Sequence, residues 1–215
     1  MQHISKQSKI YIAGHNGMVG SAIWRVLHSN GYTNLIGKSS KDLDLRNQSE
    51  VEGFFKENNI DVVVDALRAS KALPKRVMLM EWLDPIFNCG HWIPHQIGYA
   101  GGIDMLSNPS GDSVVTPWDK ILKYNPEILV VAPCGFTVKR TLEEMHILTA
   151  KKGWNGIKAV QENKVFIADF DLFTQSSANT LVNGIELLAG VFHPDAIQVP
   201  KHLSTKFMHL DLQPV

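Results

Sequence analysis

The sequence predicts an α/β fold built on parallel sheets, and three observations support this prediction. Short apolar runs of strand length alternate along the chain with segments whose apolar residues recur at helical spacing. Several of these runs end directly in glycine or proline, as buried parallel strands do. The length of 215 residues and the hydrophobic content of 44% suit one ordinary α/β domain or two small ones.

The front of the chain reads as strand, helix, strand, helix, strand. This order predicts right-handed crossovers and a parallel sheet. The expected strands are 10–13, 34–37 and 61–65, and the expected helices are 18–30 and 48–58.

Residues 67–75 interrupt the strand–helix alternation. They begin with a short helix-capable stretch, which ends at Pro74. We interpret them as a linker or a helix stump between the front unit, 1–66, and a second α/β unit, 76–195, with a surface tail at 196–215. The second unit is expected to contain strands 76–82, 128–132 and 165–168 and helices 91–100, 116–124, 137–150 and 178–192.

Composition argues against several classes of protein. The 21 basic and 21 acidic residues balance, so no nucleic acid partner is expected. No apolar run approaches the roughly 20 residues of a membrane span, and the polar N-terminus lacks a secretory signal, so we expect a cytoplasmic protein without a membrane span. The two cysteines, Cys89 and Cys134, are interpreted as buried thiols.

A glycine-rich turn follows the first expected strand. Between a strand and a helix, Gly14 permits a tight turn, Gly17 lets backbone amides approach a pyrophosphate, and Gly20 lets the helix lie close to the sheet. The positive end of the helix dipole also favours phosphate. The alternative is a tight turn without a ligand. The candidate cofactor-binding residues of this turn are Gly14, Asn16, Gly17, Met18, Val19 and Gly20.

The residues after the second expected strand favour one nicotinamide cofactor over the other. No acidic residue stands directly at the end of that strand, where Gly37 is followed by Lys38 and two serines. A cation and hydroxyl groups suit the 2′-phosphate of NADP, whereas a carboxylate would suit NAD. NADP is therefore the favoured cofactor, and the alternative is a solvated basic loop.

Residues 9–66 closely resemble the N-terminal segment of the GDP-L-fucose synthases, a family of extended short-chain dehydrogenases/reductases. The resemblance rests on residues 9–15, on residues 17–23 and on the Asp-Leu-Asp-Leu run at 42–45. It implies an NADP-binding Rossmann half, with Asp44 and Leu45 near the adenine. The chain departs from the family at Asn16, where arginine is common.

Catalysis in that family uses a serine with a Tyr-x-x-x-Lys pair, whose lysine lowers the pKa of the tyrosine for proton exchange during hydride transfer. Each of the four tyrosines, Tyr11, Tyr32, Tyr99 and Tyr124, lacks a lysine four residues later. The sequence therefore predicts no catalytic residue. Whether the chain is an enzyme stays open, with the preference against.

Residues 76–195 resemble a different family, the C-terminal lobe of ABC-importer substrate-binding proteins, especially the cobalamin-binding type. This resemblance implies a three-layer α/β lobe and a corrinoid or iron-chelate ligand. The blocks that carry it are 81–85, 90–94, 100–102, 133–136, 183–189 and 193–195.

Polar and aromatic residues at the ends of the expected strands suit a ligand rim. Open α/β sheets bind ligands at the carboxyl ends of their strands. Trp82 and Trp92 offer flat faces for a large planar ring, and His91 offers a hydrogen bond or a coordinating nitrogen. The alternative is that both tryptophans anchor the core. The candidate ligand-binding residues are Glu81, Trp82, Asp84, His91, Trp92 and Phe136.

A metal site is not predicted. His91 and His95 have the spacing that can place two metal ligands on one helix face, but Pro94 lies between them. No downstream carboxylate completes a zinc-protease motif.

Neither resemblance covers a complete protein of its family, so we interpret the chain as a fusion of two partial α/β units. The first hypothesis is a non-enzymatic small-molecule binding protein with a dinucleotide-binding turn. The second is an NADP-binding relative of GDP-L-fucose synthase without its catalytic pair, and the third is a structural protein without a small ligand. Because one lobe supplies half of a cleft, a homo-oligomer or a partner chain is expected to complete it.

Overall fold

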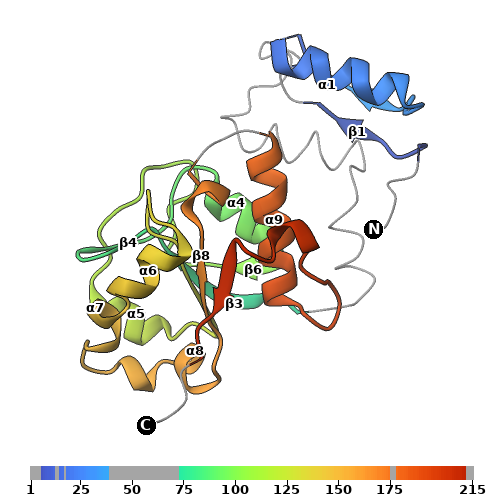
Figure 1. Cartoon of the computed structure of the whole chain (residues 1–215). Coiled ribbons are helices and arrows are strands. Elements are labelled where there is room, and N and C mark those ends of the chain that lie inside the picture. The colour runs from blue at the N-terminus through green and yellow to red at the C-terminus, as the bar shows by residue number, and fades with distance from the viewer. Residues whose placement is uncertain (1–5, 13–14, 17, 39–72, 175–177, 212–215) are drawn as a thin grey trace. The chain divides into compact units, whose positions relative to one another are not determined.

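The computed structural model describes residues 6–12, 15–16, 18–38, 73–174 and 178–211. Contacts within the chain divide it into two units, residues 1–65 and 66–215. Helices and strands alternate in both (Figure 1). The predicted mixed α/β class is therefore confirmed.

The first unit contains a strand, a helix and a second strand. These are β1 (Ile10–Tyr11), α1 (Met18–Ser29) and β2 (Leu35–Ile36), and the two strands pair in parallel. Gly31, with φ +84°, follows the helix in the left-handed conformation that glycine adopts without strain. The expected helix 48–58 and strand 61–65 lie outside the described residues.

The second unit is built on a five-stranded sheet with the order β6-β3-β7-β8-β9. Strands β6, β3, β7 and β8 are parallel, and β9 pairs antiparallel with β8. The strands are β3 (Lys75–Met80), β6 (Gly102–Ile103), β7 (Ile128–Val131), β8 (Val165–Ala168) and β9 (Phe207–His209), and a separate hairpin joins β4 (Trp82–Leu83) to β5 (Ile86–Phe87).

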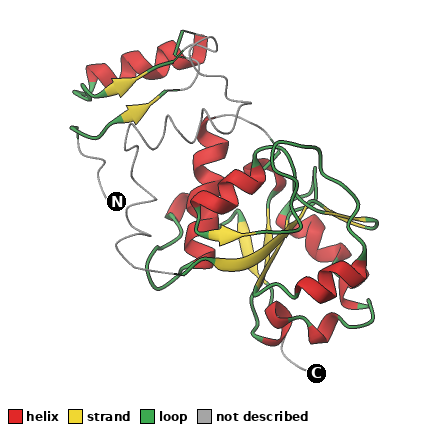
Figure 2. Cartoon of the chain, turned by 180° about the vertical axis from the view of Figure 1, so that it is seen from behind, coloured by secondary structure: helices red, strands yellow, loops and turns green. Residues whose placement is uncertain are grey.

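Helices cover both faces of this sheet (Figure 2). Met78 and Met80 of β3 pack in one core cluster with Ile121, Leu148 and Ala159, which come from helices on one face, and α4 packs against α9 on the other face. The helices are α4 (Ile93–Tyr99), α5 (Trp118–Tyr124), α6 (Val138–Glu144), α7 (His146–Thr149), α8 (Lys158–Gln161) and α9 (Ala178–Phe192), with 3₁₀ turns at Trp154–Gly156, Phe170–Leu172 and Lys201–Leu203.

The central strands are apolar on both sides because both of their faces are covered. All four residues of β7 are buried, and so are the last four of β3. Strands of this kind read as continuous apolar runs, which is why the sequence identifies them.

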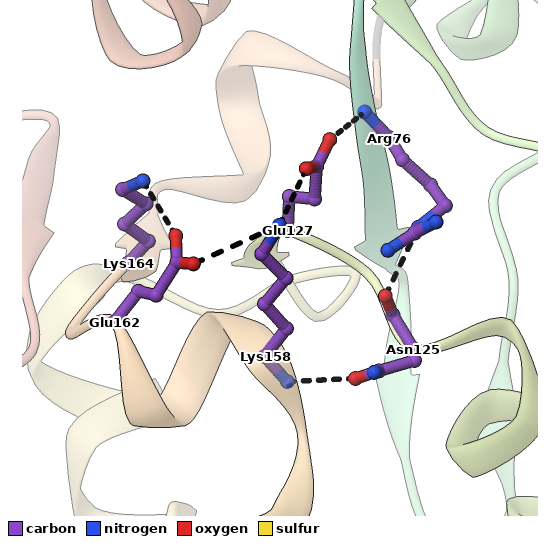
Figure 3. Close-up of polar contacts among 6 residues, drawn as sticks. All are labelled: Arg76, Asn125, Glu127, Lys158, Glu162 and Lys164. Atoms are coloured by element: carbon purple, nitrogen blue, oxygen red, sulfur yellow. Dashed lines mark hydrogen bonds and ion pairs between the residues drawn. The ribbon is translucent and has the colours of Figure 1, made fainter.

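A polar network joins the N-terminal ends of β3 and β7 (Figure 3). Glu127 accepts a hydrogen bond from the Arg76 backbone amide at 3.0 Å and one from Lys158 Nζ at 2.8 Å. Asn125 joins the same pair, because its carbonyl oxygen accepts a hydrogen bond from Arg76 Nε and its Oδ1 accepts one from the Lys158 amide. The entries into β3, β7 and α8 are thereby tied together.

Several expectations differ from the structure. The strand expected over 76–82 ends at Met80, and Trp82 belongs to the separate strand β4. The helix expected over 137–150 is divided at Met145 into α6 and α7, and the helix expected from residue 116 begins after Pro117, at Trp118. The segment predicted as a surface tail instead extends the sheet. Leu203 is only 2% exposed and β9 covers the edge of β8, because Phe207 and Met208 supply apolar side chains there.

Candidate functional site

Three loops meet at the carboxyl edge of the parallel strands β3, β7 and β8. Glu81 follows β3, Phe136 lies in the loop after β7, and Phe170 follows β8. Backbone hydrogen bonds join the loops, because the Cys134 amide donates to the Glu81 carbonyl oxygen at 2.9 Å and the Phe170 amide donates to that of Phe136 at 3.1 Å. The edge is therefore a connected surface of the kind where open α/β sheets place ligands.

Two of the predicted aromatic residues meet at this edge. Trp82, on β4, stands edge to face against Phe136, with ring centroids 5.2 Å apart. Both side chains are half-buried. Arg140, on α6, places its guanidinium carbon 5.3 Å from the centroid of the Phe136 ring. The result is an aromatic pair with a cation beside it.

Glu81 directly precedes Trp82 in the sequence, and hydrogen bonds hold its side chain in place. Its carboxylate accepts hydrogen bonds from Ser113 Oγ and from the Gly90 backbone amide. Burial raises the pKa of Glu81, whereas these hydrogen bonds and the nearby His91 act in the opposite direction.

His91 and Trp92 also lie together, with ring centroids 5.6 Å apart. His91 is exposed, has a φ of +56°, and places Nδ1 3.9 Å from Asp112 Oδ1. Trp92 is half-buried, and its Nε1 donates a hydrogen bond to the Phe173 carbonyl oxygen at 2.9 Å. The Nε1 of Trp92 is therefore already bonded to a backbone carbonyl oxygen of the protein.

Asp84 takes a different position from the other candidates. It lies exposed in the turn between β4 and β5, and its Oδ1 is 3.6 Å from Lys151 Nζ. The structure therefore joins Trp82 to Phe136 and links His91 to both Glu81 and Trp92, while Asp84 pairs with a lysine that was not among the candidates.

Sequence reasoning missed two residues that complete this edge. Arg140 and Ser113 were not among the candidates, because their partners, Phe136 and Glu81, are brought close only by the fold. Cys89 is buried as expected, but Cys134 is exposed in the turn that follows β7. The next residue in this turn, Gly135, has a φ of +81°.

The glycine turn is described only in part. Gly14, Gly17, Asp44 and Leu45 lie outside the described residues. Asn16 is exposed just before α1, Met18, Val19 and Gly20 form the first turn of that helix, and Lys38 is exposed after β2. His15 packs against Gly37, where an added Cβ would collide with its imidazole ring. This contact ties the turn to the segment that carries Lys38.

A groove of about 450 Å³ lies elsewhere in the second unit. It runs between the end of α9 and the last two strands, and Val191, Phe166 and Phe207 are among the residues that line it. The predicted ligand-binding residues are not among those that line it, so the candidate rim is separate from this groove.

Within the described residues, no group of three or more His, Cys, Asp or Glu side chains is placed to hold a metal ion. His95 Nε2 instead lies 3.3 Å from Ser110 Oγ. In the same part of the chain, no helix has both the length and the apolar character needed to cross a membrane.

The front of the chain matches a known family of enzymes. The model of the NAD dependent epimerase/dehydratase family matches residues 10–78. GDP-L-fucose synthase 1 of Arabidopsis thaliana is 47% identical over 64 residues, which are 29% of this chain and 20% of that protein. GDP-L-fucose synthase of Escherichia coli K12 is 43% identical over 60 residues, 28% of this chain and 18% of that protein. The chain thus spans about a fifth of the length of these curated relatives.

Solved structures with a similar fold are periplasmic binding proteins. The TroA-like periplasmic binding protein FepB of Veillonella parvula has a TM-score of 0.56 at 16% identity, covering 95% of this chain and 72% of that one. A periplasmic heme binding protein of Pseudomonas aeruginosa has a TM-score of 0.54 at 12% identity, covering 90% and 74%. The two predicted resemblances are thereby confirmed, the second at the level of fold.

Proposed function

We propose that the second unit is a non-enzymatic binding lobe for a small molecule with a flat conjugated ring, of the corrinoid or iron-chelate class. The observation that carries this proposal is the aromatic pair of Trp82 and Phe136 at the carboxyl edge of the sheet. Half-buried aromatic rings that keep part of their surface exposed are suited to stacking against a ligand ring. Glu81 precedes Trp82 in the chain and His91 acts electrostatically on Glu81, so these two residues would supply polar groups that orient the ligand.

The fold likeness supports the proposal without naming the ligand. One of the similar structures is described as a heme binding protein, and heme is a flat conjugated macrocycle. The exposed imidazole of His91 offers a nitrogen of the type that coordinates a macrocycle-bound metal.

Equilibrium dialysis of the full chain against cyanocobalamin and against hemin tests this function. Dialysis measures the bound ligand directly, so substituting a tryptophan does not remove the signal. We expect saturable binding of at least one ligand, weakened about tenfold by Trp82→Ala, which removes the stacking ring. Trp24→Phe, in the first unit, is the matched control and should leave the affinity unchanged. Failure of both ligands to bind would reject the function.

The binding-lobe proposal leads to a proposal about assembly as well. A single lobe contacts one side of a ligand, so a second copy or a partner chain would complete the cleft. If a second copy does so, sedimentation velocity should show a dimer that is populated only with the bound ligand.

A second candidate function rests on the family match over residues 10–78. We propose that the glycine turn binds NADP without turnover, because no tyrosine of the chain is followed by lysine four residues later. NADPH should bind more tightly than NADH, and Lys38→Ala should reduce that difference through loss of a cation for the 2′-phosphate. Equal affinity for both nucleotides in the wild type would contradict the role of Lys38.

A further inference from the structure

Arg140 has a contact at the candidate rim in addition to its ion pairs within its own helix. Its guanidinium lies against the Phe136 ring, 5.3 Å from the ring centroid. On α6 itself it pairs with two carboxylates, Glu143 at 3.3 Å and Glu144. The Arg140 side chain is 53% exposed, so its charge is accessible from solvent.

We propose, resting on the ligand-binding function above, that Arg140 selects ring ligands that bear a carboxylate. A guanidinium can keep its flat face against an aromatic ring while its edge donates two parallel hydrogen bonds to a carboxylate. A ring stacked beside Trp82 and Phe136 would bring a peripheral carboxylate within reach of that edge.

The present partners of Arg140 are suited to exchange with a ligand. Ion pairs between exposed side chains contribute little free energy, because water screens them and ordering long side chains costs entropy. Glu143 is 52% exposed, so exchanging it for a ligand carboxylate costs little. The ion pair between Arg140 and a ligand carboxylate would become stronger when the bound ring excludes water from one side of it.

The two carboxylates closest to Trp82 in sequence already have partners of their own and would not strongly repel such a ligand. Asp84 lies 3.6 Å from Lys151, and Glu81 accepts a hydrogen bond from Ser113. Arg140 thus contributes a positive charge at a place where these two negative groups have their own partners.

Protoporphyrin IX and its dimethyl ester provide the test, because they share one flat ring and differ in the charge of two substituents. Both are titrated into the full chain in the same dilute non-ionic detergent while tryptophan fluorescence is followed. We expect the acid to bind more tightly than the ester, and Arg140→Gln to weaken binding of the acid by about threefold to tenfold more than it weakens binding of the ester. Glu144→Gln should strengthen binding of the acid, since it removes a competitor for Arg140.

Lys139→Gln is the matched control, because it removes the same charge from the neighbouring exposed position of α6. Equal weakening by Lys139→Gln and Arg140→Gln would overturn the proposal, since it would show a response to net charge alone. Equal affinity for acid and ester in the wild type would overturn it as well, while leaving the ring-binding function intact. If neither porphyrin binds, and cyanocobalamin and hemin do not bind either, the role of Arg140 and the ring-binding function are both overturned.

Discussion

Trp82 and Phe136 stand edge to face, although one belongs to the hairpin after β3 and the other to the loop after β7. Such pairs contribute about 0.5–1.5 kcal/mol beyond the area that they bury. A double-mutant cycle with Trp82→Ala and Phe136→Ala, measured by urea unfolding, should give a coupling of that size. A coupling near zero would mean that the two loops are held by their backbone hydrogen bonds alone.

Trp92 is expected to stabilise the fold through a single hydrogen bond. Its Nε1 donates to the carbonyl oxygen of Phe173, a residue only 1% exposed. Trp92→Phe keeps an aromatic ring but leaves that carbonyl without this donor, which should cost about 1–3 kcal/mol. Trp118→Phe is the control, because its Nε1 donates to the carbonyl oxygen of the exposed Lys152. Equal losses of stability in both variants would argue against a special role for Trp92.

Stability should also depend on the protonation of Asp104. Burial raises the pKa of this carboxyl to about 6, although the Leu79 and Leu106 amides and the Cys89 thiol donate hydrogen bonds to it. A raised pKa means that the folded state holds the proton more tightly than the unfolded state. The stabilising effect of protonation is thus complete below about pH 4 and is lost as pH rises through about 6.

Urea unfolding at a series of pH values measures this effect. Between about pH 7 and pH 5 the wild type should gain stability relative to Asp104→Asn, a variant without this titration. The variant should be less stable at every pH, since an amide cannot replace all the acceptor sites of the carboxylate. Parallel curves for the two proteins would show that Asp104 does not titrate in this window.

The sequence predicts the parts of this fold whose signal is local. β7 and β8 are recognisable as short apolar runs, and α9 as a long stretch with helical spacing. The contact between Trp82 and Phe136 depends instead on which loops the sheet brings together, and no spacing in the chain encodes that. Arg140 illustrates the same limit, since its pairs with Glu143 and Glu144 suggest an ordinary solvated helix face while its contact with Phe136 is long-range.

Asn125 combines two roles that substitutions can separate. It ends α5 with a φ of +51°, and its Oδ1 accepts a hydrogen bond from the Lys158 amide at 2.7 Å. Asn125→Gly relieves the backbone but removes the acceptor, whereas Asn125→Ala removes the acceptor and keeps the strain. Thermal unfolding should therefore rank wild type above Asn125→Gly and Asn125→Gly above Asn125→Ala, with the last step about 1 kcal/mol. An alanine variant as stable as the glycine variant would contradict the backbone argument.

The final strand provides the sharpest contrast between the sequence and the structure. β9 pairs with β8 through Phe207, Met208 and His209, and Phe166 packs against the His209 ring at 5.0 Å. Ending the chain after Lys206 would keep the ion pairs of Lys206 with Asp169 and Asp171 but uncover the edge of β8. The lost backbone hydrogen bonds and the uncovered apolar surface should lower the free energy of unfolding by about 2–4 kcal/mol.

A second truncation, after Asp211, keeps β9 whole and should leave stability unchanged. The comparison separates strand pairing from shortening of the chain, because the first truncation removes the ladder hydrogen bonds of β9 and the second keeps them. An uncovered edge strand also pairs with other chains, so the shorter protein should aggregate at concentrations where the longer one stays dispersed, which light scattering measures. If both truncations unfold at the same urea concentration as the wild type, β9 contributes nothing to the sheet and the segment is a surface tail after all.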